Sequence, residues 1–204
     1  MTSFDTATDI DVGALRAKVS EKYREVATDP GKEFHFHTGK PHALRLGYPA
    51  TMVDGVPDAA GEAFAGIANP FSLGEVPEGT RVVDVGAGAG FDSFIAAQYV
   101  GPTGSVVGVD MTPEMLDRSR TAASDGGFDN VDFREGFAER LPVEDGWADV
   151  VISNGVINLV ADKKQAFAEI WRVLRHGGMV QFADIANGKP IPEGAVRDID
   201  LWTA

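Results

Sequence analysis

The stretch Val82-Val83-Asp84-Val85-Gly86-Ala87-Gly88-Ala89-Gly90 decides the fold of this 204-residue chain. An apolar run with one acidic residue ends in three glycines at alternate positions, which predicts a buried strand at 81–85 followed by a tight turn. Glycines at such a turn let the backbone approach a ligand closely, because no Cβ stands in the way. A helix can begin directly after the turn, at Phe91.

A second apolar run, Ser105–Val109, ends in Asp110. This carboxylate lies about 20 residues beyond Gly90, where an acidic side chain can accept hydrogen bonds from ribose hydroxyls. The two segments together predict a site for a nucleoside-containing cofactor. The pattern departs from the dinucleotide fingerprint G-x-G-x-x-G/A, because the third glycine arrives one position early and Phe91 stands where that fingerprint needs a small residue.

Composition limits the classes of function. Hydrophobic residues make up 44% and charged residues 24% of the chain, as in globular proteins, and the length suits one domain with an extension. The net charge of −13 disfavours nucleic-acid binding and suits either a positively charged cofactor or a solvated acidic surface. The chain has no cysteine, which excludes disulfides, zinc–thiolate sites and thiol nucleophiles, and we predict no metal site. With no membrane-length apolar stretch and no signal-peptide pattern, the sequence predicts a cytoplasmic location without membrane contact.

The apolar periodicity divides the chain into two parts. Residues 1–75 read as a helical and irregular N-terminal extension that acts as a lid, with disorder at 1–10, an amphipathic helix over 11–27 and a short helix near 58–66. Residues 76–204 read as the cofactor-binding domain, an α/β fold whose parallel sheet carries helices on both faces. The predicted strands are 81–85, 105–109, 130–133, 148–153 and 178–184, and the predicted helices lie near 91–100, 113–125 and 162–175, the last ended by Gly177-Gly178.

Four segments with polar or small residues follow four of these strands. They are residues 86–90, 110–111, 136–139 and 153–158. In an open parallel sheet, ligands bind beyond the carboxyl ends of the strands, so these segments are expected to meet at one edge of the sheet.

Five runs resemble class I S-adenosylmethionine-dependent methyltransferases, and in particular the arsenite methyltransferase-like branch. The runs are Val82–Asp92, Val107–Met115, Asn130–Pro142, Asp149–Leu159 and Arg172–Gly178, and the resemblance covers about residues 65–202. It implies a Rossmann-like sheet in the order 3-2-1-4-5, S-adenosyl-L-methionine as the cofactor, and methyl transfer to a small-molecule acceptor. Arsenite is the acceptor that the resemblance suggests.

The resemblance also implies roles for individual residues. The glycine turn would bind the methionine part of the cofactor, and Asp84 would hold either that turn or the ammonium group. Asp110 would bind the ribose hydroxyls. Met111 would pack on the adenine or belong to the core, and Glu139 would contribute at the adenine edge or be a solvated surface charge. The remaining implied cofactor-binding residues are Gly86, Ala87, Gly88 and Gly90 in the turn, Phe137 and Ala138 beside the adenine, and Asn154 and Val156 facing the sulfonium and the acceptor.

The chain departs from the arsenite branch in its acceptor side. Gly155 and Ala68 stand where members of that branch often carry cysteine, and trivalent arsenic prefers sulfur ligands. Two alternatives therefore stay open: a methyltransferase for an organic small molecule of the quinone or natural-product type, and a cofactor-binding protein without turnover. No catalytic base can be named from the sequence, although Tyr23 and Tyr48 are candidates to reach the acceptor pocket.

The two ends of the chain raise further expectations. Only residues 186–204 follow Ile185, too few for the helix and hairpin that class I methyltransferases usually add, so the C-terminal hairpin is expected to be missing or truncated. Either the chain is a fragment, or the apolar strand at 180–183 has an exposed edge, which predicts a homodimer or poor solubility. The run Phe34–Gly39 carries two histidines, which could bind a metal or a proton, or else pack locally.

Overall fold

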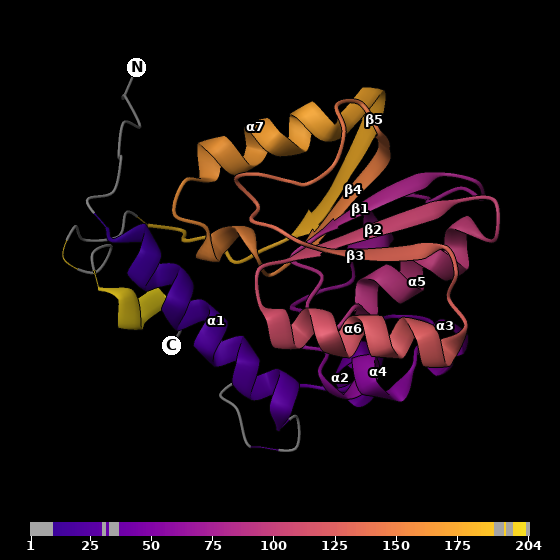
Figure 1. Ribbon diagram of the computed structural model, residues 1–204, viewed down its shortest axis with the longest axis horizontal. Helices are drawn as coiled ribbons and strands as arrows, with labels where there is room; N and C mark the ends of the chain where they lie inside the picture. The colour runs from indigo at the N-terminus through magenta and orange to yellow at the C-terminus, as the bar shows by residue number, and fades with distance from the viewer. Residues whose placement is uncertain (1–9, 30–31, 33–36, 190–193, 195–197, 203–204) are drawn as a thin grey trace.

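A computed structural model describes residues 10–29, 32, 37–189, 194 and 198–202. Five parallel strands form one sheet in the order β3-β2-β1-β4-β5 (Figure 1). This confirms the predicted α/β class and the predicted strand order. The strands are β1 (Arg81–Val85), β2 (Ser105–Asp110), β3 (Val131–Glu135), β4 (Ala148–Asn154) and β5 (Leu174–Ala183).

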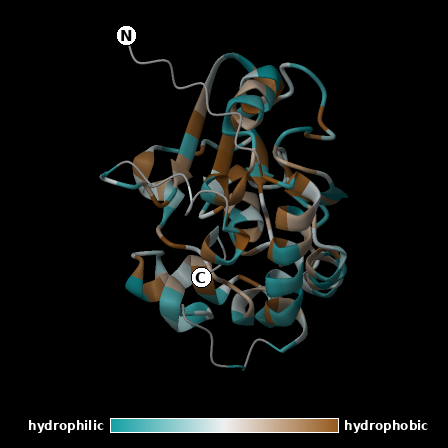
Figure 2. Cartoon of the chain, turned by 90° about the vertical axis from the view of Figure 1, so that its left-hand side faces the viewer, coloured by the Kyte–Doolittle hydropathy of each residue, from teal (hydrophilic) through white to brown (hydrophobic). Residues whose placement is uncertain are grey.

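Helices cover both faces of the sheet, as predicted. Alternate residues of the central strands point to opposite faces, so that Val82 packs with Val100 on one face and Val83 packs with Ile170 on the other. The strands are apolar on both faces and lie at the centre of the molecule in Figure 2. One face carries α5 (Phe91–Val100) and α6 (Pro113–Gly126), and the other carries α7 (Lys163–Val173) (Figure 1).

The N-terminal extension begins with α1 (Val12–Thr28), one residue away from the predicted bounds at each end. The Asp11 side chain caps this helix by accepting a hydrogen bond from the backbone N–H of Ala14 at 3.0 Å. Apolar side chains along one face of α1, Leu15, Val19 and Val26, are buried, and the helix packs against α6 and η3 (Ile199–Trp202). Four short helices follow: α2 (Lys40–Arg45), α3 (Ala50–Asp54), α4 (Asp58–Glu62) and η1 (Pro70–Leu73).

Two expectations about the extension remain predictions. The disorder expected at 1–10 falls outside the described residues except for Ile10, whose side chain is buried. The division of the chain at residue 75 is likewise untested.

The boundary between α7 and β5 corrects the prediction. The helix ends at Val173 rather than 175, and β5 begins at Leu174 rather than 178. Leu174 has an extended backbone and pairs with Ala148, so the chain gains a ladder contact by leaving the helix early. Gly177 and Gly178 therefore lie inside the strand, where Gly177 has φ +77° beside a shift in register, and they do not end the helix.

Strand β5 lies at one edge of the sheet. Val180 and Phe182 are partly exposed beside α7, whose Trp171 is 81% exposed. Exposed apolar edges favour pairing with other strands, which is consistent with the expected homodimer. The homodimer itself stays a prediction. Within the described part of the chain, no helix combines the length and apolarity that a membrane crossing requires.

Candidate functional site

One pocket lies at the carboxyl ends of the strands and collects nearly all of the predicted site residues. Its lining includes the glycine turn after β1, the end of β2, the segment after β3 and the end of β4. The predicted residues that line it are Asp84, Gly86, Ala87, Gly88, Asp110, Met111, Phe137, Ala138, Glu139, Asn154 and Val156.

The three glycines of the turn have different roles. A Cβ on Gly86, which has φ +76°, would lie 2.3 Å from a methyl carbon of Val156, so this position requires glycine for packing. At Gly88 the nearest atom to such a Cβ would be the Met115 sulfur at 3.9 Å, so the backbone there is open to a ligand. Gly90 lies outside the pocket lining, because its Cβ position faces the Phe133 ring at 2.6 Å. The structure thus gives Gly90 a packing role at the start of α5.

Asp110 joins the end of β2 to the glycine turn. One carboxylate oxygen accepts a hydrogen bond from the backbone N–H of Gly88 at 2.8 Å, and the other accepts one from Thr112 N–H at 2.8 Å. Burial raises the pKa of this carboxyl, while these backbone donors act in the opposite direction. A carboxylate oxygen can accept more than one hydrogen bond, so Asp110 keeps the capacity to accept from the hydroxyls of a ribose.

The segment after β3 meets α1 across the pocket. The Arg16 guanidinium lies 4.0 Å from the centre of the Phe137 ring and 3.2 Å from the Glu139 carboxylate. Glu139 is therefore ion-paired at the pocket wall rather than a solvated surface charge. Met111 packs against the Leu15 and Val19 cluster of α1, which gives it a partly core role as well as a place in the lining.

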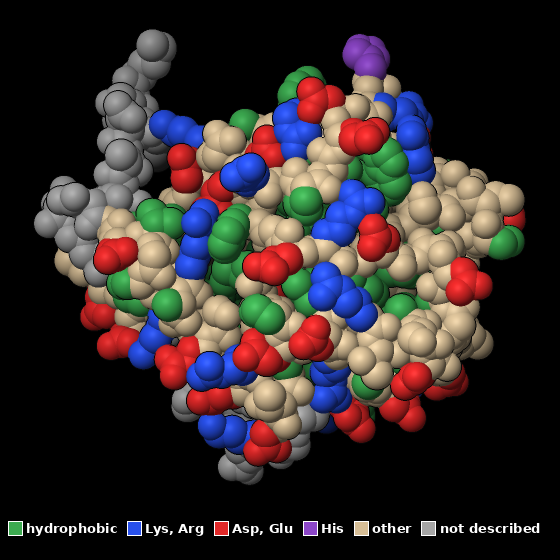
Figure 3. Space-filling view, in the orientation of Figure 1, with side chains coloured by type: hydrophobic (Ala, Val, Ile, Leu, Met, Phe, Trp, Pro, Cys, Tyr) green, Lys and Arg blue, Asp and Glu red, His purple; other side chains and the backbone are tan. Residues whose placement is uncertain are grey.

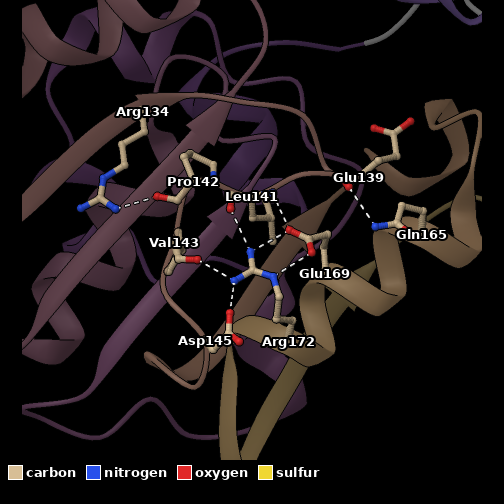
Figure 4. A network of polar contacts seen from close by, with 9 residues as sticks. All are labelled: Arg134, Glu139, Leu141, Pro142, Val143, Asp145, Gln165, Glu169 and Arg172. Atoms are coloured by element: carbon tan, nitrogen blue, oxygen red, sulfur yellow. Dashed lines mark hydrogen bonds and ion pairs between the residues drawn. The ribbon is translucent and has the colours of Figure 1, made fainter.

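Arg172 of α7 holds the connection from β3 to β4 in place (Figure 4). Its guanidinium donates to the carbonyls of Leu141 at 2.9 Å and Val143 at 2.8 Å, and it forms a two-pronged pair with Glu169 at 2.7 Å. Glu169 in turn accepts a hydrogen bond from the Leu141 N–H at 2.8 Å. This network fixes the loop whose first residues form the Phe137 wall of the pocket.

Two buried carboxylates lie in the pocket on the β1 side. Asp84 accepts a hydrogen bond from the Ser93 hydroxyl at 2.7 Å, and Asp92 accepts one from the Asn154 amide at 3.0 Å. Burial raises the pKa of both carboxyls. Sequence reasoning did not single out Asp92 as a site residue. The available signal was an acidic residue in the first turn of an otherwise apolar helix.

The N-terminal extension supplies much of the remaining wall. Tyr23 lines the pocket, and burial raises its pKa to about 12, so the phenol keeps its proton at neutral pH. Tyr23 was a candidate from the sequence, whereas the following apolar wall residues were not: Val19, Ala60, Ala63, Phe64, Ala65 and Gly66 from the extension, and Leu159, Val160 and Ala161 from the segment after β4. Arg16 adds a positive charge from α1.

The described residues of the histidine-rich run, 37–39, lie outside the pocket lining. His35 lies outside the described residues. The His37 ring lies 5.6 Å from that of His42, which hydrogen-bonds the Gly66 carbonyl at 2.9 Å. Gly66 belongs to the pocket wall, so His42 supports the wall from behind.

The family profile of a methyltransferase domain matches residues 77–201. The chain belongs to this family. The match takes in β1 to β5 and therefore all the strand ends that build the pocket. It confirms that the fold is that of a class I methyltransferase domain, and the S-adenosylmethionine cofactor implied by the resemblance agrees with this family.

Several relatives of this methyltransferase domain are named arsenite methyltransferases. The one from Halobacterium salinarum is 45% identical over 159 residues, which are 78% of this chain and 40% of the relative. The mouse protein is 38% identical over 61% of this chain and 36% of its own length. The chain thus spans about two fifths of the length of the curated relatives that it matches.

A solved structure is also similar to this methyltransferase domain. The crystal structure of an arsenic(III) S-adenosylmethionine methyltransferase from Chlamydomonas reinhardtii is 37% identical and aligns with a TM-score of 0.60. The alignment covers 76% of this chain and 52% of that protein.

Proposed function

We propose that this methyltransferase domain binds S-adenosyl-L-methionine in the pocket and takes part in methyl transfer to a small-molecule acceptor. The observation that carries this proposal is the link between Asp110 and Gly88. It places a carboxylate suited to ribose hydroxyls next to an open glycine backbone, at the edge of the sheet where this family's cofactor is expected.

The pocket residues fit the parts of that cofactor. Met111 and Phe137 offer apolar surfaces for an adenine ring, and Asp110 offers acceptors for a ribose. Asp84 and Asp92 offer negative charge for an ammonium group. When bound, the cofactor would supply an electrophilic methyl group on a sulfonium, and its transfer to the acceptor would release S-adenosylhomocysteine. The residues of this chain orient the two reactants and exclude water, which is how such a displacement gains most of its rate.

The relatives' names suggest arsenite as the acceptor. The composition of the pocket limits the form in which arsenite could bind. The chain has no cysteine, and the wall from Ala63 to Gly66 offers no sulfur. Trivalent arsenic prefers thiolate ligands. Arsenite would therefore reach this pocket with its sulfur ligands supplied by another molecule, such as a small thiol, or by polypeptide outside this sequence.

Two measurements test the proposal. Calorimetry with S-adenosylmethionine and S-adenosylhomocysteine tests the cofactor, and absence of heat with both would refute the proposal. Turnover is then measured by mass spectrometry with arsenite, with and without an excess of glutathione. Methylated arsenic that forms only with the thiol supports the arsenite proposal. Binding of the cofactor without methylated arsenic would instead favour an organic acceptor or a module without turnover.

A further inference from the structure

Tyr48 lies behind the pocket and joins three segments that are distant in sequence. It follows α2 in the N-terminal extension and is buried at 3% exposure. Its hydroxyl lies 2.5 Å from an Asp92 carboxylate oxygen, 3.1 Å from the Ala68 carbonyl and 3.1 Å from the Asn154 amide nitrogen. The hydroxyl therefore contacts the start of α5, the end of β4 and the wall segment next to Gly66.

The Tyr48 hydroxyl has more hydrogen-bond acceptors nearby than it has protons to donate. The single Tyr48 hydroxyl proton has two acceptors within reach, the Asp92 carboxylate and the Ala68 carbonyl. With Asp92 ionised, the hydroxyl donates to the carboxylate. With Asp92 protonated, the carboxyl can donate to the Tyr48 oxygen, while Tyr48 turns its own proton to Ala68. Both charge states of Asp92 are thus hydrogen-bonded without movement of heavy atoms.

We propose that Tyr48 is a positioning residue that lets Asp92 change its charge when a ligand binds. In the empty pocket the two buried carboxyls Asp84 and Asp92 raise each other's proton affinity and together hold a proton, and a ligand that brings an ammonium group displaces this proton into solvent. This rests on the proposed function, because the ammonium expected here is that of the amino-acid end of the cofactor. Tyr48 itself acts only through Asp92, since it lies outside the pocket lining.

The charges around Asp92 favour this exchange. Asp84 of β1 and Asp110 of β2 line the same pocket as Asp92. The negative charges of Asp92 and Asp110 both raise the pKa of Asp84. The donors to the two inner carboxylates are neutral, namely the hydroxyls of Tyr48 and Ser93 and the amide of Asn154. The Arg16 guanidinium of the pocket lining is paired with Glu139. A cationic ligand group therefore enters a site with excess negative charge.

The ionisation energetics agree with this geometry. Burial raises the pKa of Asp92, and the hydrogen bonds from Tyr48 and Asn154 lower it again in part. Burial also raises the pKa of Tyr48, so the phenol stays protonated while the carboxyl titrates. Removal of the Tyr48 hydroxyl should therefore raise the pKa of Asp92 further and leave a smaller fraction of it ionised at pH 7.

The test compares Tyr48→Phe with the wild-type chain by calorimetry between about pH 5 and pH 9, a range that brackets the ordinary carboxyl value and any upward shift. S-adenosylhomocysteine carries the ammonium group, and 5′-methylthioadenosine lacks the whole amino-acid end. For the first ligand, we expect affinity to rise with pH and the midpoint of this rise to move up by about one pH unit in Tyr48→Phe, with about tenfold weaker binding well below the wild-type midpoint. For the second ligand, the two pH profiles should coincide.

Two variants keep the result specific. Tyr99→Phe makes the same chemical change in α5 outside the pocket lining and should behave as the wild type for both ligands. Asp92→Asn cannot ionise at this position and should lose the part of the pH dependence for S-adenosylhomocysteine that comes from Asp92, leaving the part that comes from Asp84. Equal midpoints for Tyr48→Phe and the wild type would overturn the inference alone. Failure of both nucleosides to bind at any pH would overturn the proposed function as well.

A ligand-free measurement tests the same point. The side-chain carboxyl ¹³C shift of Asp92 in the empty chain should titrate above the ordinary carboxyl value, and higher still in Tyr48→Phe. Titration of Asp92 near pH 4, the ordinary value, would refute the inference whatever the ligands do.

Discussion

The carboxylate of Asp110, the last residue of β2, accepts a hydrogen bond at 2.8 Å from the backbone N–H of Gly88, which lies in the turn after β1. The side chain expected to bind the ribose therefore also shapes the turn expected to bind the methionine part. Its second oxygen fixes Thr112 at the start of α6. A change at Asp110 consequently affects three segments of the pocket at once.

We expect Asp110→Ala to weaken S-adenosylmethionine binding by about 1–3 kcal/mol, the usual cost of lost hydrogen bonds to a charged acceptor. The unfolding free energy should fall too, because two backbone N–H groups lose their acceptor. Asp110→Asn retains one acceptor oxygen and should lie between the wild type and Asp110→Ala in both properties. Calorimetry and urea denaturation measure the two effects, and an unchanged affinity in Asp110→Ala would place the ribose elsewhere.

Substitutions at Gly86 and Gly88 should separate packing from ligand access. Gly86→Ala forces a Cβ against Val156 and keeps a left-handed backbone, so the unfolding free energy should fall by about 2–4 kcal/mol. In Gly88→Val the new side chain extends into the open pocket, so the unfolding free energy should fall by only about 1–2 kcal/mol, from backbone strain. Cofactor binding should be abolished, because the valine occupies the space of the ligand. Thermal melts and calorimetry distinguish the two patterns.

A double-mutant cycle checks the Gly86 argument. Val156→Ala removes the methyl groups that a Cβ on Gly86 would meet. Gly86→Ala should therefore cost less in the Val156→Ala background than in the wild type. Equal costs in both backgrounds would show that the overlap is not the cause.

Arg172→Met should lower the unfolding free energy by about 1–3 kcal/mol, because it leaves the Leu141 and Val143 carbonyls and the Glu169 carboxylate without their shared donor. Arg172→Lys should recover only part of this loss, since an ammonium cannot reproduce the planar, two-pronged geometry. Arg134→Met is the control, because that side chain donates to a single loop carbonyl, Pro142. A control loss as large as that of Arg172→Met would contradict the assignment.

The contribution of Asp84 to the stability of the ligand-free chain should fall as the pH rises above about 4, the ordinary carboxyl value. Burial raises the pKa of Asp84, so the folded chain keeps a proton that the unfolded chain has already released. The stabilisation is therefore complete below that ordinary value and is lost as the pH rises through the folded-state pKa. Asp84→Asn should make this decline shallower. Urea denaturation from about pH 5 to pH 8 measures this decline in both chains. A steeper decline in Asp84→Asn than in the wild type would contradict a raised pKa of Asp84.

Arg16 should control the rate at which a nucleoside leaves the pocket. Its side chain connects α1 to Phe137 and Glu139, so Arg16→Gln should speed ligand dissociation while changing the unfolding free energy by less than about 1 kcal/mol. Lys18→Gln, on the same helix and paired with exposed Asp200, is the control. Stopped-flow measurement of dissociation should show a faster rate in Arg16→Gln and an unchanged rate in the control.

The sequence predicted the sheet and the place of the pocket well. Buried parallel strands carry long apolar runs, and glycine or acidic residues mark where these strands end. Val82–Gly90 is the clearest case. The same logic failed at Gly177, where a glycine that resembles a helix stop serves a change of register inside β5. Pairing of Leu174 with Ala148 decides that boundary, and no local pattern reports it.

The site was predicted where it follows the strands and missed where it depends on contacts between distant segments. Asp92 and Arg16 have no motif of their own, and each is defined by a partner far away in the sequence, Asn154 and Glu139 respectively. Gly90 was predicted from the ligand-binding pattern, but its Cβ position faces the Phe133 ring of β3 and it lies outside the pocket lining. Its part in cofactor binding stays a prediction.

The helix that closes the pocket is made before the parts it closes. Synthesis completes α1 well ahead of β2 and β4, so Leu15, Val19 and Val26 have no partners in the sheet domain while that domain is still inside the ribosome. Long-range contacts of this kind form late and slow folding. A nascent chain of this protein therefore carries an amphipathic helix whose apolar face stays uncovered until α6 and the residues around Leu159 have been made, because these segments supply the side chains that pack on it.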